Sequence, residues 1–136
     1  MTPTRAMMTV PLLDLKAQYA PLRKEIRAVV DEVFESQYFI GGPQVDGLEK
    51  ELAAYTGAKH AIGCTSGTDA ILLGLWALGV GPGDEVITSP YTFFATVGST
   101  ARLGAHCRFV DIDPATYNLD IAKVEKAITK KTKAIM

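Results

Sequence analysis

Apolar side chains recur at helical spacing in the first part of the chain. They are Leu22, Ile26, Val29, Val30, Val33 and Phe34, with charged residues between them. This pattern predicts an amphipathic helix. We expect it to end before Phe39–Pro43, where two glycines and a proline interrupt regular structure. A second helix is predicted to begin after Asp46 as N-cap, with Glu49 as its capping-box partner, and to end before Gly57.

From residue 59 the pattern changes to short apolar runs that alternate with helical segments. Strands are predicted at 60–64, 85–88, 107–110 and 133–136. Helices are predicted at 70–78, at 92–103 and from an N-cap at Asp120 through Ile128. This alternation is typical of an α/β fold with a parallel sheet and right-handed crossovers.

The predicted sheet also indicates where a ligand would bind. Ligands of parallel sheets bind beyond the carboxyl ends of the strands, so we expect loops 64–69, 88–93 and 110–113 on the ligand side. The 70–78 segment is apolar on every side. We therefore expect this helix to be deeply buried, with Trp76 in the core.

Composition narrows the class of protein. The 136 residues are 48% apolar and 21% charged with a net charge of −1, which excludes disorder and gives no electrostatic footprint for nucleic acid or an anionic membrane. No apolar run is long enough for a membrane helix, and residues 1–8 contain no secretory signal. Two cysteines make no disulfide framework, so a reduced cytosolic protein is expected. Because residues 133–136 read as the start of a strand, we expect the front part of a larger domain.

The segment from Cys64 to Asp69 is the sharpest candidate site. A helix N-terminus presents free N–H groups to a phosphate, Gly67 allows close approach, and the Ser66 and Thr68 hydroxyls add donors. The alternative is a plain capping box with Ser66 as the cap and Asp69 as its partner. Neither a Walker loop nor a dinucleotide fingerprint is present. Asp69 would repel a phosphate unless its carboxylate faces elsewhere.

Other chemistry-bearing residues are open to two interpretations. In Tyr91–Phe94 an aromatic side chain could lie against a planar ring, or both phenylalanines could be core. Asp111 and Asp113 could ligate a metal or accept a proton, but turn formation before Pro114 is favoured. We interpret His60 and His106 as structural. Cys64 is interpreted as a small buried hydrophobe rather than a reactive thiol.

Taken together, several segments resemble, in their order and spacing, the nucleotide-sugar aminotransferases of the DegT/DnrJ/StrS type. The segments are Phe39–Pro43, Leu48–Gly57, Ser66–Ala70, Leu78–Ile87, Thr92–Thr96, Val110–Pro114, Thr116–Asp120 and Thr132–Ile135. The resemblance implies a fold-type-I enzyme dependent on pyridoxal 5′-phosphate. It implies a three-layer α/β sandwich with a mainly parallel sheet. Residues 1–58 would be an N-terminal segment and helices packing on the large domain, and 59–136 the incomplete first part of that cofactor-binding domain.

The resemblance also implies roles for single residues. Ser66, Gly67, Thr68 and Asp69 match the segment that holds the cofactor phosphate, and Phe93 matches the residue that stacks on the cofactor ring. The Phe39, Ile40 and Gly41 segment matches a loop near the active site at a dimer interface. No lysine of this chain matches the Schiff-base lysine, which is expected beyond Met136. We therefore expect this chain alone to be inactive.

The implied reaction passes an amino group, by family habit from glutamate, to a keto group of a nucleotide-linked sugar for polysaccharide or glycan synthesis. The implied partners are the nucleotide sugar, the amino donor and a second copy in a cytosolic homodimer, with neither nucleic acid nor membrane. Residues 117–120 look closest to members that use 3-keto sugars. Alternatives are a dehydratase on the same fold, a regulatory relative, and a chain with no function of its own.

Overall fold

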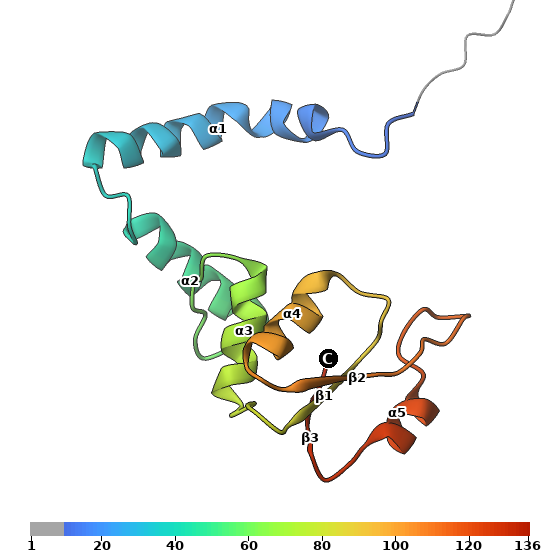
Figure 1. Cartoon of the computed structure of the whole chain (residues 1–136). Coiled ribbons are helices and arrows are strands. Elements are labelled where there is room, and N and C mark those ends of the chain that lie inside the picture. Colours follow the sequence, from blue (N-terminus) through green and yellow to red (C-terminus); the bar gives the residue numbers. More distant parts are fainter. Residues whose placement is uncertain (1–9) are drawn as a thin grey trace, which may run out of the picture. The chain divides into compact units, whose positions relative to one another are not determined.

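A computed structural model describes residues 10–136, which divide into two compact units at the Ala61–Ile62 boundary. The first unit contains two helices, α1 (Leu15–Ser36) and α2 (Pro43–Thr56) (Figure 1). The second contains the helices α3 (Gly67–Ala77), α4 (Phe94–Arg102) and α5 (Ile121–Ala127), with the strands β1 (Glu85–Thr88), β2 (His106–Phe109) and β3 (Thr132–Ile135). Within residues 10–136, no helix combines the length and apolar character needed to cross a membrane.

The first helix begins seven positions earlier than the apolar pattern predicts. Asp14 is its N-cap, and the Asp14 carboxylate accepts a hydrogen bond from the N–H of Ala17 at 3.0 Å. A side-chain cap satisfies a first-turn donor and so allows the helix to start there. Pro21 lies inside α1. The expected end before Phe39 is confirmed, since Gln37 closes the helix in the left-handed conformation.

The second helix corrects one predicted cap. Pro43 occupies the start of α2 and Gly42 is its N-cap with φ of 105°. Asp46 is therefore a first-turn residue rather than the N-cap, because proline with its fixed φ and missing N–H already fits the first helical position. Gly57 lies just past the end with φ of 70°, as predicted.

The second unit confirms the α/β prediction. Its three strands are parallel in the order β2-β1-β3, and Val86 in the central strand pairs with Cys107 on one side and Ala134 on the other. The strand predicted at 60–64 is wrong, because that segment has no strand assignment. A strand needs a backbone ladder with a neighbour. The sheet of the described chain contains β2, β1 and β3, and residues 60–64 are not a strand of this sheet.

Helices cover both faces of the sheet. Val86 and Ile87 are both 0% exposed. Because successive side chains of a strand point to opposite faces, Val86 and Ile87 belong to two separate core clusters. Val86 packs with Leu75, Val80 and Ala105 on the side of α3 and α4. Ile87 packs with Val110, Val124 and Ala127 on the side of α5. The three-layer arrangement is therefore confirmed.

Two burial predictions for this unit are wrong. Leu75 is the buried residue of α3, while Trp76 is 67% exposed and Leu73 is 44% exposed. The cause is that α3 packs with one face on the core formed by Val86 and its neighbours. Cys64 is exposed rather than buried. Sequence hydrophobicity identified α3 as apolar, but the elements packed against it decide which of its faces is covered.

Candidate functional site

Ser66 caps the N-terminus of α3 as the capping alternative predicts, whereas the Asp69 carboxylate bonds to the Thr65 hydroxyl instead of completing the capping box. Ser66 is the N-cap in extended conformation, and its Oγ accepts a hydrogen bond from the N–H of Asp69 at 3.1 Å. Capping by Ser66 occupies the donor of Asp69 and leaves the N–H groups of Gly67 and Thr68 without intrahelical acceptors. A Cβ added to Gly67 would meet no atom within 4 Å. Capping and anion binding are therefore compatible at this turn.

The Asp69 carboxylate is held by two side chains. The Thr65 hydroxyl donates a hydrogen bond to Oδ2, and Arg102 Nη1 lies 3.6 Å from Oδ1. The Thr65 hydrogen bond is the largest cause that lowers the pKa of Asp69 below its ordinary value; burial opposes it, and the positive charge of Arg102 adds to the lowering. Asp69 is therefore ionised near neutral pH, with its charge directed to Thr65 and Arg102.

Thr68 and Phe93 line one cavity of about 520 Å³. Phe93 is the N-cap of α4 and is 79% exposed, so its ring is open to a ligand. Phe94 is 76% exposed, and the alternative that both phenylalanines are core is wrong. The remaining walls come from α4 and include Gly98 and Arg102. None of the residues lining this cavity is a lysine.

This cavity fits a planar molecule that carries a phosphate. Thr68 is the residue of the first turn of α3 that lines the cavity, and its N–H and hydroxyl can bind an anion, while the Phe93 ring offers a flat apolar face to an aromatic ring. Pyridoxal 5′-phosphate, the cofactor that the sequence resemblance implies, has both parts. The residues present therefore fit that group.

The Phe39, Ile40 and Gly41 segment belongs to the first unit. Phe39 meets Phe34 edge-on, with ring centroids 5.7 Å apart. Ile40 is 93% exposed, and with Gly41 it lines a cavity of about 850 Å³ between the end of α1 and the start of α2. The structure describes this loop within its own unit, so its role at an active site or dimer interface stays a prediction.

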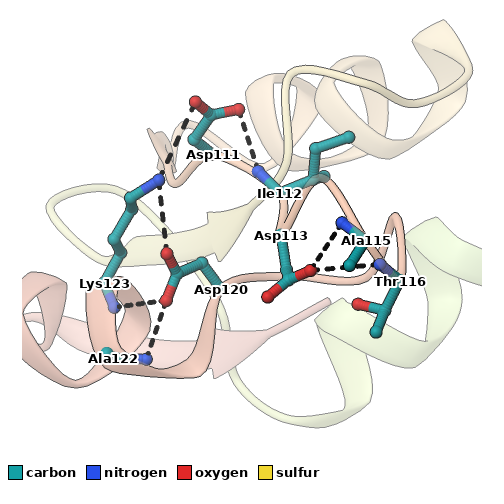
Figure 2. A network of polar contacts seen from close by, with 8 residues as sticks. All are labelled: Asp111, Ile112, Asp113, Ala115, Thr116, Asp120, Ala122 and Lys123. Carbon is teal, nitrogen blue, oxygen red and sulfur yellow. Dashed lines mark hydrogen bonds and ion pairs between the residues drawn. The ribbon is translucent and has the colours of Figure 1, made fainter.

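The two aspartates after β2 have different partners (Figure 2). Asp113 Oδ1 accepts hydrogen bonds from the N–H groups of Ala115 at 2.8 Å and Thr116 at 3.0 Å. Asp111 pairs with Lys123 at 3.9 Å, and Lys123 also pairs with Asp120 at 3.2 Å. Across residues 10–136, no three His, Cys, Asp or Glu residues gather as a metal site. The turn-forming interpretation is therefore confirmed for Asp113, whereas Asp111 forms an ion pair with Lys123.

Sequence reasoning missed two residues beside the candidate site. Ser99 Oγ donates to the carbonyl oxygen of Thr68 at 3.1 Å, and Arg102 pairs with Asp69. Ser99 is one of several small residues in its helix, so nothing in the sequence distinguishes it as a residue of the site. Arg102 carries a weak one, as the only charged residue in the small-residue segment from Phe93 to Ala105.

Comparison with known proteins adds independent information. The model of the DegT/DnrJ/EryC1/StrS aminotransferase family matches residues 21–136. The chain is 60% identical to a pleiotropic regulatory protein of Geobacillus stearothermophilus, over 95% of this chain and 35% of that protein. It is 49% identical to the UDP-2-acetamido-2-deoxy-3-oxo-D-glucuronate aminotransferase of Pseudomonas aeruginosa, over 93% of this chain and 35% of that enzyme.

Solved structures show the same fold. The crystal structure of ntda from Bacillus subtilis with bound cofactor PMP matches with a TM-score of 0.89 and 38% identity, covering 96% of this chain and 30% of that one. The expected fold, the N-terminal part of a fold-type-I domain, is confirmed by this likeness. The chain spans about a third of the length of the relatives that it matches.

Proposed function

Because this chain belongs to the DegT/DnrJ/EryC1/StrS aminotransferase family, we propose that the complete protein carrying it is a pyridoxal-phosphate-dependent nucleotide-sugar aminotransferase. One observation carries the proposal: Thr68 at the start of α3 and Phe93 at the start of α4 line the same cavity. A first-turn helix residue that can bind phosphate and an aromatic face in one cavity are two features that this cofactor requires.

The residues of this chain would bind and orient the cofactor. The N–H groups of Gly67 and Thr68, with the hydroxyls of Ser66 and Thr68, would bind the phosphate at the positive end of α3. Phe93 would hold the aromatic ring by stacking. Bound pyridoxal phosphate supplies an electron sink and carries the amino group between substrates. Because no lysine lines the cavity, we expect the 136-residue chain alone to turn over no substrate.

We propose a nucleotide-linked 3-keto sugar as the amino acceptor and glutamate as the donor, with the product serving polysaccharide or glycan synthesis. The relative from Pseudomonas aeruginosa is named for a 3-oxo nucleotide sugar. The 117–120 segment lies beside the carboxyl edge of the sheet, where Tyr117 and Asn118 line a cavity of about 540 Å³ with Thr88 and Ser89. Hydroxyl and amide groups at this edge suit a polar sugar ligand.

We also propose that the complete protein is a cytosolic homodimer. The amphipathic helix α1 leaves Leu22, Ile26 and Val30 between 42% and 45% exposed, and Phe34 59% exposed. Apolar stripes of this kind are normally covered by another surface. The Phe39–Gly41 loop follows this helix directly, and we place it at the subunit interface near the active site.

A regulatory role is the second candidate. It is favoured by the name of the 60% identical relative, a pleiotropic regulatory protein. A net charge of −1 offers no basic surface to DNA. The two candidates differ in one measurable property. An aminotransferase cycles its cofactor between two forms, and a regulator does not.

The test uses the complete protein and follows the cofactor absorbance band. Glutamate is expected to bleach the band, and a UDP-linked 3-keto sugar is expected to restore it, with stoichiometric formation of the amino sugar. Release of an unaminated, dehydrated sugar would support the dehydratase instead. Absence of any spectral response to every amino donor would contradict aminotransferase activity. The 136-residue chain alone serves as the matched control and is expected to give no turnover.

A further inference from the structure

The first turn of α3 carries a negative charge beside its proposed phosphate donors. Asp69 follows Thr68 directly, and its side chain is 34% exposed. A phosphate bound by the N–H groups of Gly67 and Thr68 would therefore lie close to a second anion. Like charges at such a separation weaken binding of the phosphate unless one of them is compensated.

Arg102, the last residue of α4, supplies the opposite charge. Its Nη1 lies 3.6 Å from Asp69 Oδ1, and its side chain is 59% exposed. Three residues earlier in the same helix, Ser99 donates to the carbonyl oxygen of Thr68 at 3.1 Å. That buried hydrogen bond holds the end of α4 beside the first turn of α3, so the Arg102 contact follows from helix packing.

We propose that Arg102 is a positioning residue that pairs with the Asp69 carboxylate, so that the start of α3 accepts a phosphate dianion. This inference rests on the function proposed above. Arg102 acts through Asp69 in two ways: its charge offsets the carboxylate, and its guanidinium draws Oδ1 toward the end of α4. Thr65 binds the other oxygen, so both carboxylate oxygens have partners.

Two ligands that differ only in the phosphate test this role. Dissociation constants of pyridoxamine 5′-phosphate and pyridoxamine are measured for the complete protein by calorimetric titration, which needs no turnover. Arg102→Gln is expected to raise the constant for pyridoxamine 5′-phosphate about threefold to fivefold, in the range of exposed ion pairs. It should leave the constant for pyridoxamine within about twofold. Arg102→Lys, which keeps the charge, should recover most of the loss.

The double variant separates action through Asp69 from direct binding. If Arg102 acts by compensating Asp69, then Asp69→Asn/Arg102→Gln should bind pyridoxamine 5′-phosphate about as tightly as Asp69→Asn alone. If Arg102 instead contacts the phosphate, adding Arg102→Gln should weaken binding in Asp69→Asn as much as in the unaltered protein, and our proposal is wrong. The control is Arg108→Gln in β2, since Arg108 forms an ion pair of similar length with Glu85, at 3.8 Å.

The remaining outcomes are also decisive. An unchanged ratio of the two dissociation constants in Arg102→Gln would overturn the role of Arg102 while leaving the proposed function in place. If the unaltered protein binds pyridoxamine 5′-phosphate no more tightly than pyridoxamine, the proposed phosphate site fails, and the role of Arg102 fails with it. Circular dichroism confirms that each variant is folded, and the comparison of the double variant with Asp69→Asn gives the decision if Arg102→Gln is not.

Discussion

Ser99 Oγ donates a hydrogen bond to the carbonyl oxygen of Thr68 at 3.1 Å, joining two helices across 31 positions of sequence. The Ser99 side chain is 0% exposed. Thr68 lies in the first turn of α3, and Phe93 caps the helix that carries Ser99. This bond therefore links the start of α3, which carries the proposed phosphate donors, to α4. The proposed stacking residue, Phe93, directly precedes α4.

Removing this bond should loosen the pair of helices. Ser99→Ala is expected to lower the free energy of unfolding by about 1 kcal/mol, the net contribution of a typical hydrogen bond. Urea denaturation of the complete protein measures the change. Ser36→Ala is the matched control, because Ser36 donates to a carbonyl oxygen of its own helix and is exposed. If Ser99→Ala and Ser36→Ala lower the free energy of unfolding equally, the link between α3 and α4 adds no stability of its own.

Phe93 should contribute an aromatic face rather than apolar volume. Phe93→Leu keeps a large apolar side chain and is expected to weaken binding of pyridoxamine 5′-phosphate by about 1 kcal/mol, the usual worth of an aromatic pair. Pyridoxamine should lose the same amount, because the ring is common to both ligands. Phe109→Leu in β2, where Phe109 is 52% exposed, is the control and should leave both affinities unchanged. An unaltered affinity in Phe93→Leu would remove the stacking role.

Acid should weaken the cap of α5. The N–H of Lys123, with further bonds and the Lys123 charge, lowers the pKa of Asp120 below its ordinary value of 3.8. A lowered pKa in the folded state means that the ionised cap stabilises the protein above about pH 4. This contribution is lost as the pH falls through the folded-state pKa. Asp120→Asn should keep a capping oxygen but flatten this acid dependence of the urea midpoint.

Two controls complete the Asp120 experiment. Asp120→Ala removes the capping oxygen that accepts from Ala122 and Lys123, so its midpoint should be lower at neutral pH as well. Asp31→Asn, within α1, should preserve the acid dependence of the unaltered protein. An Asp120→Asn midpoint that falls with acid as steeply as that of the unaltered protein would assign the dependence to other carboxylates.

The two glycines before α2 should respond differently to alanine. A Cβ on Gly42 would lie 2.9 Å from Cδ1 of Tyr38, and φ of +105° is a conformation that L side chains rarely adopt. Gly41 has φ of +69° and nothing within 4 Å of its Cβ position. Gly42→Ala should therefore destabilise the complete protein by about 1 kcal/mol more than Gly41→Ala in urea denaturation. Equal costs would show that the Tyr38 ring moves aside freely.

Local signals explain which elements could be predicted. The sequence predicts the strand at 85–88 with the bounds that the structure shows, and it identifies the caps at Ser66 and Asp120, because a cap depends only on residues within about four positions. The predicted strand at 60–64 failed, since a strand requires a neighbour that no local pattern supplies. The burial of Trp76 failed for a related reason: an apolar helix is covered only where another element packs on it.

The sequence by itself determined the alternation of strands and helices, the helix caps and the family, because periodicity and motif spacing are properties of the chain as written. Only the tertiary structure decided that Thr68 and Phe93 share a cavity, that Ser99 binds the Thr68 carbonyl and that Arg102 meets Asp69. These relationships join residues 25 to 33 positions apart. They exist because the packing of α3 and α4 beside Val86 brings the start of one helix to the side of the other.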